Sequence, residues 1–409
     1  MPVNSKTRKT VSLCLALLFA AVLTAAGCAQ SDYYVGFSLS SDFYVDGKKL
    51  SDSERSTLQG EISAILHETE DSVDAEGDGD LARIGDSGTG VITPVGEHVR
   101  TLLTLSETLY KEMGGAFSPA LYNLSDLWGF SPSHEGRYGV SRAEPSAEEI
   151  AEALADSQFT DITLTESGVV KENADTRLDL GGIAKGYMCD LIYRHLQSKY
   201  AGRELNGTFS VMSSGTVLIG QKITASGSRG YTASIENPRR LTTNVNEAAF
   251  FVGLSDVVLS TSADTYRFYT HNGQIYSHII DPHTGKSSEN GVISITVIVP
   301  LSVPYAGALA DAYSTAGFCM PLTDALAFYE EQALQNGIGA VVITSDFKYY
   351  VVGDYQVLTR REYAELTNPD IADTIEDIFI RTDVAQANDE VILCDKEKEY
   401  IAYVEERSE

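Results

Sequence analysis

The sequence has little positive charge and few cysteines. Of its 409 residues, 30 are Lys or Arg and 58 are Asp or Glu, which gives a net charge of −28. Nucleic-acid binding needs Lys and Arg to neutralise phosphates, so this balance argues against a nucleic-acid partner. Three of the five cysteines, Cys189, Cys319 and Cys394, stand singly without CxxC spacing. Metal–thiolate chemistry and a disulfide framework are therefore not expected.

The remaining composition is that of a globular protein. Hydrophobic residues make up 43% of the chain. A chain of this length is long enough for one large domain or two medium ones. No internal repeat or low-complexity tract stands out in the sequence.

The N-terminus carries a targeting segment. Three basic residues precede an apolar run over residues 11–24, which is too short for a comfortable membrane span. Small residues then lead to Cys28, a pattern that resembles a bacterial lipoprotein signal. Cleavage after residue 27 and acylation of the Cys28 thiol would anchor the exported chain to the cell membrane. The alternative is an ordinary secretory signal with a chance cysteine, and both interpretations place the protein outside the cytoplasm.

Local patterns predict several helices and strands. Apolar spacing and capping residues predict helices over residues 51–66, 97–113 and 146–154. Alternation predicts a strand pair within 33–45 and a hairpin over 161–170. An acidic stretch over residues 74–80 has some features of a calcium loop, but Gly85 stands where the closing Glu belongs. We therefore expect a solvated loop there.

A glycine turn lies within residues 177–190, RLDLGGIAKGYMCD. It joins a predicted strand over 175–180 to a predicted helix over 184–199, and a strand around 208–212 would complete a βαβ-like unit. The N–H groups of Gly181 and Gly182 at a helix start suit a phosphate, whereas a tight connection without a ligand is the alternative. In so acidic a chain a bound phosphate needs added positive charge, which a divalent cation supplies.

Other glycine-rich and aromatic segments are less specific. A second glycine turn follows at residues 213–220, and neither turn is a GxGxxG or a P-loop, so a Rossmann dinucleotide site is not supported. Residues 114–130, GGAFSPALYNLSDLWGF, include the only tryptophan, Trp128. This run is suited to lining a ligand slot, but we favour the interpretation that its apolar side chains close the core.

A candidate base lies in residues 276–285, YSHIIDPHTG. Pro282 and Gly285 predict a turn that holds His278 and Asp281 near a strand end. Histidine is suited to general-base catalysis near neutral pH, although a lone histidine is more often structural.

An Ala-rich helix is predicted over residues 305–320. It places Asp311 and Thr315 on one face, because they lie four residues apart. Carboxylate and hydroxyl oxygens are hard ligands that suit Mg²⁺. Taken alone, an i, i+4 contact inside a buried helix is the more ordinary interpretation of this pair.

Four motifs together resemble the ApbE family of FAD:protein FMN transferases, which are often exported lipoproteins. The motifs are LDLGGIAKGYMCD, GGAFSPALYNLSDLWGF, YSHIIDPHTG and ADAYSTA, in the order and spacing of the family. The resemblance implies an α+β fold, with mixed sheets and packed helices in a single large domain that binds FAD. It also implies that Mg²⁺ bridges the FAD pyrophosphate, and that FMN moves to a Thr or Ser hydroxyl of an exported target protein with release of AMP.

The resemblance assigns roles position by position. The implied metal ligands are the Ala184 carbonyl, Asp311 and Thr315. His278 is the implied base, and it binds FAD together with Ile279 and Asp281. The base would remove the proton of the target hydroxyl while Mg²⁺ neutralises the pyrophosphate. The other implied flavin-nucleotide contacts are Ala116, Phe117, Ser118, Asp179, Gly181, Gly182, Lys185 and Tyr187.

Four positions depart from the family pattern. Ser118 stands where the family usually has Asp, Ser213 and Ser214 replace part of a glycine pair, and Ala263 replaces the Gly of a TSGD run. These changes leave the metal and base positions intact, so we expect an active enzyme. The alternatives are Mg²⁺-dependent hydrolysis of FAD to FMN and AMP, and a non-catalytic FAD-binding lipoprotein.

The predicted organisation has four segments. They are a signal peptide (1–27), an anchor linker (28–34), the transferase domain (35–350) and an acidic C-terminal extension (351–409). Within the extension, we predict that residues 351–358 complete a sheet, that 370–379 are helical and that 390–393 form a strand. A small appendage and a docking tail are both open interpretations of this extension.

Overall fold

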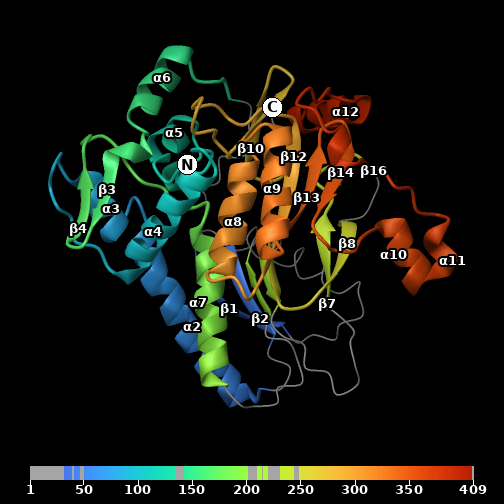
Figure 1. Ribbon diagram of the computed structural model, residues 1–409, viewed down its shortest axis with the longest axis horizontal. Coiled ribbons are helices and arrows are strands. Elements are labelled where there is room, and N and C mark those ends of the chain that lie inside the picture. The colour runs from blue at the N-terminus through green and yellow to red at the C-terminus, as the bar shows by residue number, and fades with distance from the viewer. Residues whose placement is uncertain are drawn as a thin grey trace, which may run out of the picture.

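The computed structural model describes residues 32–38, 41–46, 50–134, 142–200, 210–213, 215–219, 231–243 and 248–407. Within these ranges, helices and mixed sheets form one α+β domain (Figure 1). The α+β class predicted from the sequence is therefore confirmed.

A nine-stranded sheet forms the centre of the described part of the molecule, in the order β1-β2-β5-β6-β9-β12-β13-β14-β16. Neighbouring strands pair antiparallel, except for the parallel pair β14 and β16. The first two strands are the pair predicted within residues 33–45. The strands are β1 (Asp32–Ser38), β2 (Ser41–Asp46), β5 (Ser210–Ser213), β6 (Thr216–Ile219), β9 (Val257–Ala263), β12 (Val292–Pro300), β13 (Gly339–Thr344), β14 (Lys348–Val352) and β16 (Ile380–Arg381).

Both faces of this sheet are covered. Strand β12 is buried from Val292 to Val299, which explains its nearly continuous apolar sequence VISITVIVP. One face carries the main core under α2 (Asp52–Val73), α7 (Ala184–Lys199), α8 (Ala306–Gly317) and α9 (Leu322–Asn336) (Figure 1). The other face packs on a three-stranded sheet of β15 (Val357–Thr359), β8 (Ala248–Leu254) and β7 (Tyr231–Glu236).

Shorter elements gather beside the sheet, on the left of Figure 1. They are α3 (Asp80–Asp86), α4 (Glu97–Glu112), α5 (Tyr122–Leu127), α6 (Ala147–Ala155), the 3₁₀ turns Pro132–His134 and Phe159–Asp161, and the hairpin of β3 (Ile162–Thr165) and β4 (Gly168–Lys171). The predicted helices over 97–113 and 146–154 and the hairpin over 161–170 are confirmed. Ser146 and Glu149 form the predicted capping box, whereas the helix predicted over 51–66 continues to Val73.

The strand predicted over residues 175–180 was wrong. This segment joins no sheet, because its partner is a loop: the Asp179 N–H donates to the Pro119 carbonyl at 2.7 Å. The βαβ-like unit is therefore absent, although the helix over 184–199 has the predicted bounds. The acidic stretch forms the predicted loop, which leads into α3 and is exposed over residues 76–78.

The C-terminal part differs from its predicted elements. Val351 and Val352 end β14 in the main sheet, whereas β15 joins the small sheet. The predicted helix over 370–379 is only α11 (Pro369–Ala372), and residues 390–393 form no strand. The remaining elements are the hairpin of β10 (Phe268–His271) and β11 (Gln274–Ser277), α10 (Arg360–Thr367), the 3₁₀ turn Val384–Gln386 and α12 (Asp395–Glu405).

The predicted signal peptide and its Cys28 anchor lie outside the described residues. Of the helices that are described, none combines the length and the hydropathy needed to cross a membrane. Lipidation at Cys28 and an extracytoplasmic location therefore stay predictions.

Helices α7 and α8 pack unusually closely. A Cβ at Gly186 would lie 2.0 Å from the carbonyl oxygen of Gly307, and a Cβ at Gly307 would lie 2.3 Å from the carbonyl oxygen of Gly186. Non-bonded atoms do not approach so closely, so this contact requires glycine at both positions.

We expect Gly186→Ala to lower the free energy of unfolding by about 1–3 kcal/mol, because the added methyl group forces the two helices apart. Gly60→Ala on α2 is the matched control, since a Cβ there has nothing within 4 Å. The control should be neutral or stabilising by up to about 1 kcal/mol, because Ala favours the helix over Gly. Urea unfolding of both variants tests this, and equal stabilities would contradict the close packing.

Candidate active site

The helices α7 and α8 cap one another through two carboxylates. The Gly186 N–H, in the first turn of α7, donates to Asp311 Oδ2 at 3.0 Å. In return, the N–H groups of Gly307 and Ala308, in the first turn of α8, donate to Asp190 at 2.8 and 3.0 Å. Neither helix has a side-chain cap from its own N-cap residue, so each depends on the other for these bonds.

This crossing brings the predicted metal ligands to the glycine turn. A Cβ at Gly182 would lie 3.2 Å from Thr315 Cγ2 and 3.5 Å from Thr315 Oγ1, which shows that the turn lies directly against this side chain. Gly186, two residues beyond Ala184, donates to Asp311. Ala184 therefore lies between the two points where the turn and helix α7 meet α8.

The oxygens around Asp311 form a polar cluster inside an apolar core. Asp311 is 5% exposed, and Ser260 and Ser262 from β9 contribute hydroxyl groups beside it. Ser260 Oγ lies 3.5 Å from Asp311 Oδ1, and Ser262 Oγ lies 3.3 Å from Thr315 Oγ1. Within the described residues, no Lys or Arg side chain forms an ion pair with Asp311. A buried carboxylate without a cationic partner suits a bound cation.

Asp190 is the second buried carboxylate of the crossing. Burial raises its pKa to about 6, although its hydrogen bonds from Ala308 and Gly307 lower the pKa. Asp190 was not among the site residues predicted from the sequence. The missed signal is a Gly-x-x-x-Asp pair in both helices, GYMCD at 186–190 and GALAD at 307–311. A Gly and an Asp four residues apart share one helix face, so each pair matches the other across the crossing.

The predicted flavin segment lies against the same turn. Phe117 is buried, and its ring lies 3.6 Å from the position of a Cβ on Gly182. Asp179 Oδ1 accepts from the Gly181 N–H at 2.7 Å, and its other oxygen lies 3.4 Å from Ser125 Oγ. The structure therefore brings the segment around Phe117 and the glycine turn together.

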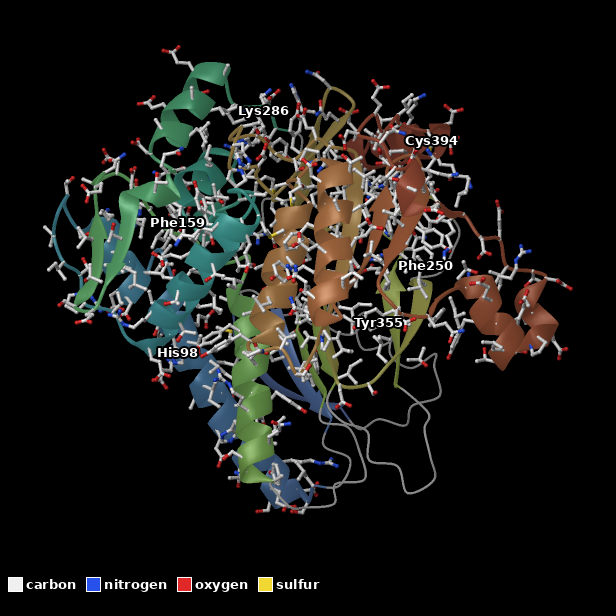
Figure 2. The ribbon with its side chains drawn as sticks, in the orientation of Figure 1. His98, Phe159, Phe250, Lys286, Tyr355 and Cys394 are labelled. Carbon is white, nitrogen blue, oxygen red and sulfur yellow. The ribbon has the colours of Figure 1, made fainter. Side chains whose placement is uncertain are left out.

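Other predicted flavin contacts have mainly structural partners. Ala116 is buried, and the Ser118 hydroxyl accepts from the Ala120 N–H at 3.2 Å. Lys185 Nζ donates to the Gly181 carbonyl at 2.7 Å, within the turn. Tyr187 is 2% exposed, and its hydroxyl lies 3.1 Å from Nδ1 of His98, which α4 directs toward α7 (Figure 2).

His278 has the environment of a neutral base. The backbone N–H of His278 donates to the Arg267 carbonyl at 2.9 Å, and the ring atom Nδ1 lies 3.2 Å from the same oxygen. A carbonyl only accepts, so this contact places the ring proton on Nδ1 and leaves the Nε2 lone pair available. Burial, with the charges of Arg267 and Lys185, holds the pKa of His278 well below its usual range.

The residues after His278 form the predicted turn. The Gly285 N–H donates to the Asp281 carbonyl at 2.9 Å, and the Asp281 side chain accepts from the His283 N–H at 2.9 Å. His283 Nε2 lies 3.0 Å from the Gly114 carbonyl, so the turn reaches the glycines that precede Phe117. The indole N–H of Trp128 donates to the Gly285 carbonyl at 2.8 Å. Ile279 is buried in the main core.

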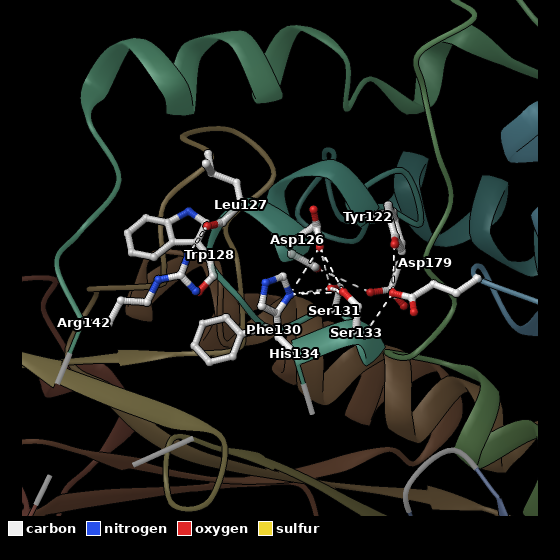
Figure 3. Close-up of polar contacts among 12 residues, drawn as sticks. Tyr122, Asp126, Leu127, Trp128, Phe130, Ser131, Ser133, His134, Arg142 and Asp179 are labelled. Carbon is white, nitrogen blue, oxygen red and sulfur yellow. Dashed lines mark hydrogen bonds and ion pairs between the residues drawn. The ribbon is translucent and has the colours of Figure 1, made fainter. Parts of the chain in front are cut away.

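The loop after α5 also packs against His278. Phe130 lies edge-to-face against His278, with ring centroids 6.3 Å apart. Figure 3 shows Arg142 reaching the carbonyls of Leu127 and Trp128, at 3.0 and 3.1 Å. In the same view, the Ser131 hydroxyl donates to Asp126 at 2.7 Å. Trp128 and Phe130 are buried in one apolar cluster, as the core interpretation predicts for these two side chains.

One position that departs from the family pattern, Ala263, lies next to this site in the chain. Ala263 ends β9 and pairs with Ser294 of β12, one residue after Ser262. Ser213 ends β5, and Ser214 lies outside the described residues.

These elements define a class of protein: an α+β domain that sets a buried aspartate and several hydroxyl groups beside a glycine turn, and that also holds a histidine with a lowered pKa. The sequence matches the model of the ApbE family over residues 36–342. The chain therefore belongs to the ApbE family.

Individual relatives agree with this assignment. A Vibrio cholerae protein named FAD:protein FMN transferase is 28% identical over 290 residues, which cover 68% of this chain and 80% of the relative. A Haemophilus influenzae protein of the same name is 27% identical over 345 residues, covering 80% of this chain and 92% of the relative.

Solved structures share the fold. The apo form of the Pseudomonas stutzeri flavinyl transferase ApbE aligns with a TM-score of 0.61 at 25% identity, over 83% of this chain and 98% of that one. The ApbE protein of Thermotoga maritima aligns with a TM-score of 0.63 at 24% identity, over 80% of this chain and 97% of that one.

The raised pKa of Asp190 predicts a pH-dependent term in stability. Its pKa rises from 3.8 to about 6 on folding, so the folded state binds this proton more tightly. The resulting stabilisation is present below the unfolded pKa and is lost as the pH rises through about 6. A shift of this size corresponds to roughly 3 kcal/mol.

Asp190→Asn removes this titration and tests the prediction. In metal-free buffer, the free energy of unfolding of the wild type should fall relative to that of the variant by up to about 3 kcal/mol between pH 4 and 7. Urea unfolding at each pH measures both curves. Parallel curves over this range would show that Asp190 does not titrate there.

Proposed function

We propose that this chain is an Mg²⁺-dependent FAD:protein FMN transferase that modifies an exported protein. It moves FMN from FAD to a Thr or Ser hydroxyl of the target and releases AMP. Membership of the ApbE family and the names of the relatives support flavin transfer. The observation that carries the proposal is the buried Asp311, with Thr315, held against the glycine turn with no Lys or Arg ion pair from the part of the chain that the structure describes.

The described residues fit a magnesium ion. The Asp311 carboxylate, the Thr315 hydroxyl and the Ala184 carbonyl are hard oxygen donors, and the serine hydroxyls of β9 lie beside them. Thr315 Oγ1 donates its proton to the Asp311 carbonyl at 3.0 Å, so its lone pairs remain for a cation. When bound, Mg²⁺ would neutralise the pyrophosphate and polarise the attacked phosphorus.

His278 accepts the proton in the transfer step. The target hydroxyl oxygen forms a bond to the FMN phosphorus, and the bond from that phosphorus to the AMP oxygen breaks. The hydroxyl proton goes to Nε2 of His278, which is neutral because the pKa of this side chain is low. The Arg267 carbonyl holds the Nδ1 proton and so fixes the ring orientation.

The N-terminal sequence supports a location outside the cytoplasm. The apolar run and Cys28 support export and a lipid anchor, which would place the site on the outer face of the membrane. The target would then be an exported protein with an acceptor Thr or Ser.

One incubation separates the possible activities. Purified protein is mixed with FAD, Mg²⁺ and an exported flavin-acceptor domain, and the products are separated on a denaturing gel and by chromatography. In-gel flavin fluorescence of the acceptor supports transfer. Free FMN and AMP without labelled acceptor would support FAD hydrolysis, and unchanged bound FAD would support a binding protein.

We expect His278→Ala to retain FAD binding and to lose transfer by about 10²–10⁴-fold, because a positioned base contributes rate of that order. His271→Ala, in the neighbouring hairpin, is the control and should keep full activity. Flavin fluorescence gives the transfer rate, and equilibrium dialysis gives FAD binding. Full transfer by His278→Ala would remove this residue as the base.

Because the pKa of His278 is low, the base stays deprotonated through the ordinary histidine range. The rate should therefore fall only below pH 6.5, as the pH passes the lowered pKa. A rate that halves at pH 6.5 or above would contradict this assignment.

We expect Asp311→Ala to lose activity together with its dependence on Mg²⁺, because it removes the only carboxylate of the proposed metal site. Asp324→Asn, an exposed change on α9, is the control. Transfer rates across a Mg²⁺ titration measure both. If Asp311→Ala is fully active at saturating Mg²⁺, the metal assignment is wrong.

A further inference from the structure

Helix α12 lies beyond the residues that match the family, yet it returns to the main domain through a buried ion cluster. Arg239 Nε and Nη2 donate to the two oxygens of Glu397 on α12, both at 2.7 Å. Its Nη1 and Nη2 donate to the two oxygens of Asp264 at 2.6 and 2.7 Å. Arg239 is 0% exposed and Glu397 2%, so water screens neither charge.

The cluster fixes the segment that carries the partner of His278. Asp264 is the first residue after β9, and three residues later comes Arg267, whose carbonyl binds the N–H and Nδ1 of His278. Phe268, directly after Arg267, is buried in an apolar cluster with Tyr400 and Val404 of α12. Helix α12 therefore holds residues 264–268 at both ends, once by charge and once by apolar contact.

Burying charges is costly, and well-packed apolar side chains in the same place commonly stabilise a protein as much or more. The planar guanidinium group of Arg239 also fixes orientation, because its N–H donors bind two carboxylates in fixed directions. The centroid of the Tyr400 ring lies 4.4 Å from the Arg239 guanidinium carbon, so α12 also restricts the orientation of the guanidinium plane.

We propose that Glu397 and Arg239 are positioning residues for His278, through Asp264 and the Arg267 carbonyl. The C-terminal helix then helps to position the base through these contacts. This inference rests on the proposed transfer activity, in which His278 is the base.

Glu397→Gln tests the proposal, with Glu399→Gln as the matched control. Both residues lie on α12, but Glu399 is exposed. Loss of one carboxylate loosens residues 264–268, so we expect Glu397→Gln to lower kcat about 10-fold or more. The KM for FAD should stay within about twofold, because the glycine turn is untouched. Glu399→Gln should match the wild type in both.

The pH profile separates positioning from a structural role. The charged groups that act on His278 are Arg267, before it in the chain, and Lys185 from α7. If residues 264–268 loosen, water reaches the imidazole ring of His278. The pH below which kcat falls should then move up toward the ordinary histidine pKa of about 6.5. Glu397→Asp, which keeps the charge, should restore part of kcat. A kcat for Glu397→Gln equal to that of the control would overturn the proposal.

Two further measurements keep the test decisive. If Glu397→Gln does not fold, Arg239→Lys keeps the charge without the planar guanidinium group and should show the same loss of kcat and the same upward shift in the pH below which kcat falls. Histidine NMR of the full chain gives the pKa of His278 even if the wild type transfers no flavin. A higher pKa in Glu397→Gln but not in Glu399→Gln supports the proposal without the transfer assay, and an unchanged pKa overturns it.

Discussion

The crossing of α7 and α8 is the contact on which the candidate site depends. Gly186 and Gly307 let the two backbones meet, and each helix then uses an aspartate of the other as its N-terminal cap. The free N–H groups of a helix start would otherwise lie unsatisfied in an apolar core. Because Asp311 has one oxygen committed to Gly186, its position relative to the glycine turn is fixed before any ligand binds. The same packing thus stabilises the fold and positions Asp311 among the hydroxyl groups around it.

The other residues of the candidate site are connected to this crossing through buried contacts. The turn before α7 lies against Thr315 and Phe117, and Lys185 at its end influences the titration of His278. A single carbonyl, that of Arg267, sets the tautomer of the proposed base. The ion cluster of Arg239 connects that carbonyl to α12, about 130 residues farther along the chain. Structural and chemical roles therefore share the same buried polar contacts.

Local signals in the sequence predicted local structure well. The bounds of helix 184–199 and the capping box at Ser146 depend on residues within a few positions, and both were correct. The strand predicted over 175–180 failed because alternation cannot show that its partner is the Pro119 carbonyl rather than a strand. Asp190 was missed because its pattern has meaning only beside the matching one in α8. The link from Arg239 to Glu397 spans 158 residues and leaves no periodic signal.

We propose above that the oxygens of Asp311, Thr315 and Ala184 hold a divalent cation against the pyrophosphate of FAD. Phosphorus-31 NMR of FAD bound to the protein tests it directly, with paramagnetic Mn²⁺ in place of Mg²⁺. We expect Mn²⁺ at one equivalent per site to broaden both pyrophosphate resonances of the bound FAD strongly. Resonances of bound FAD that keep the same width with and without Mn²⁺ would contradict this metal site.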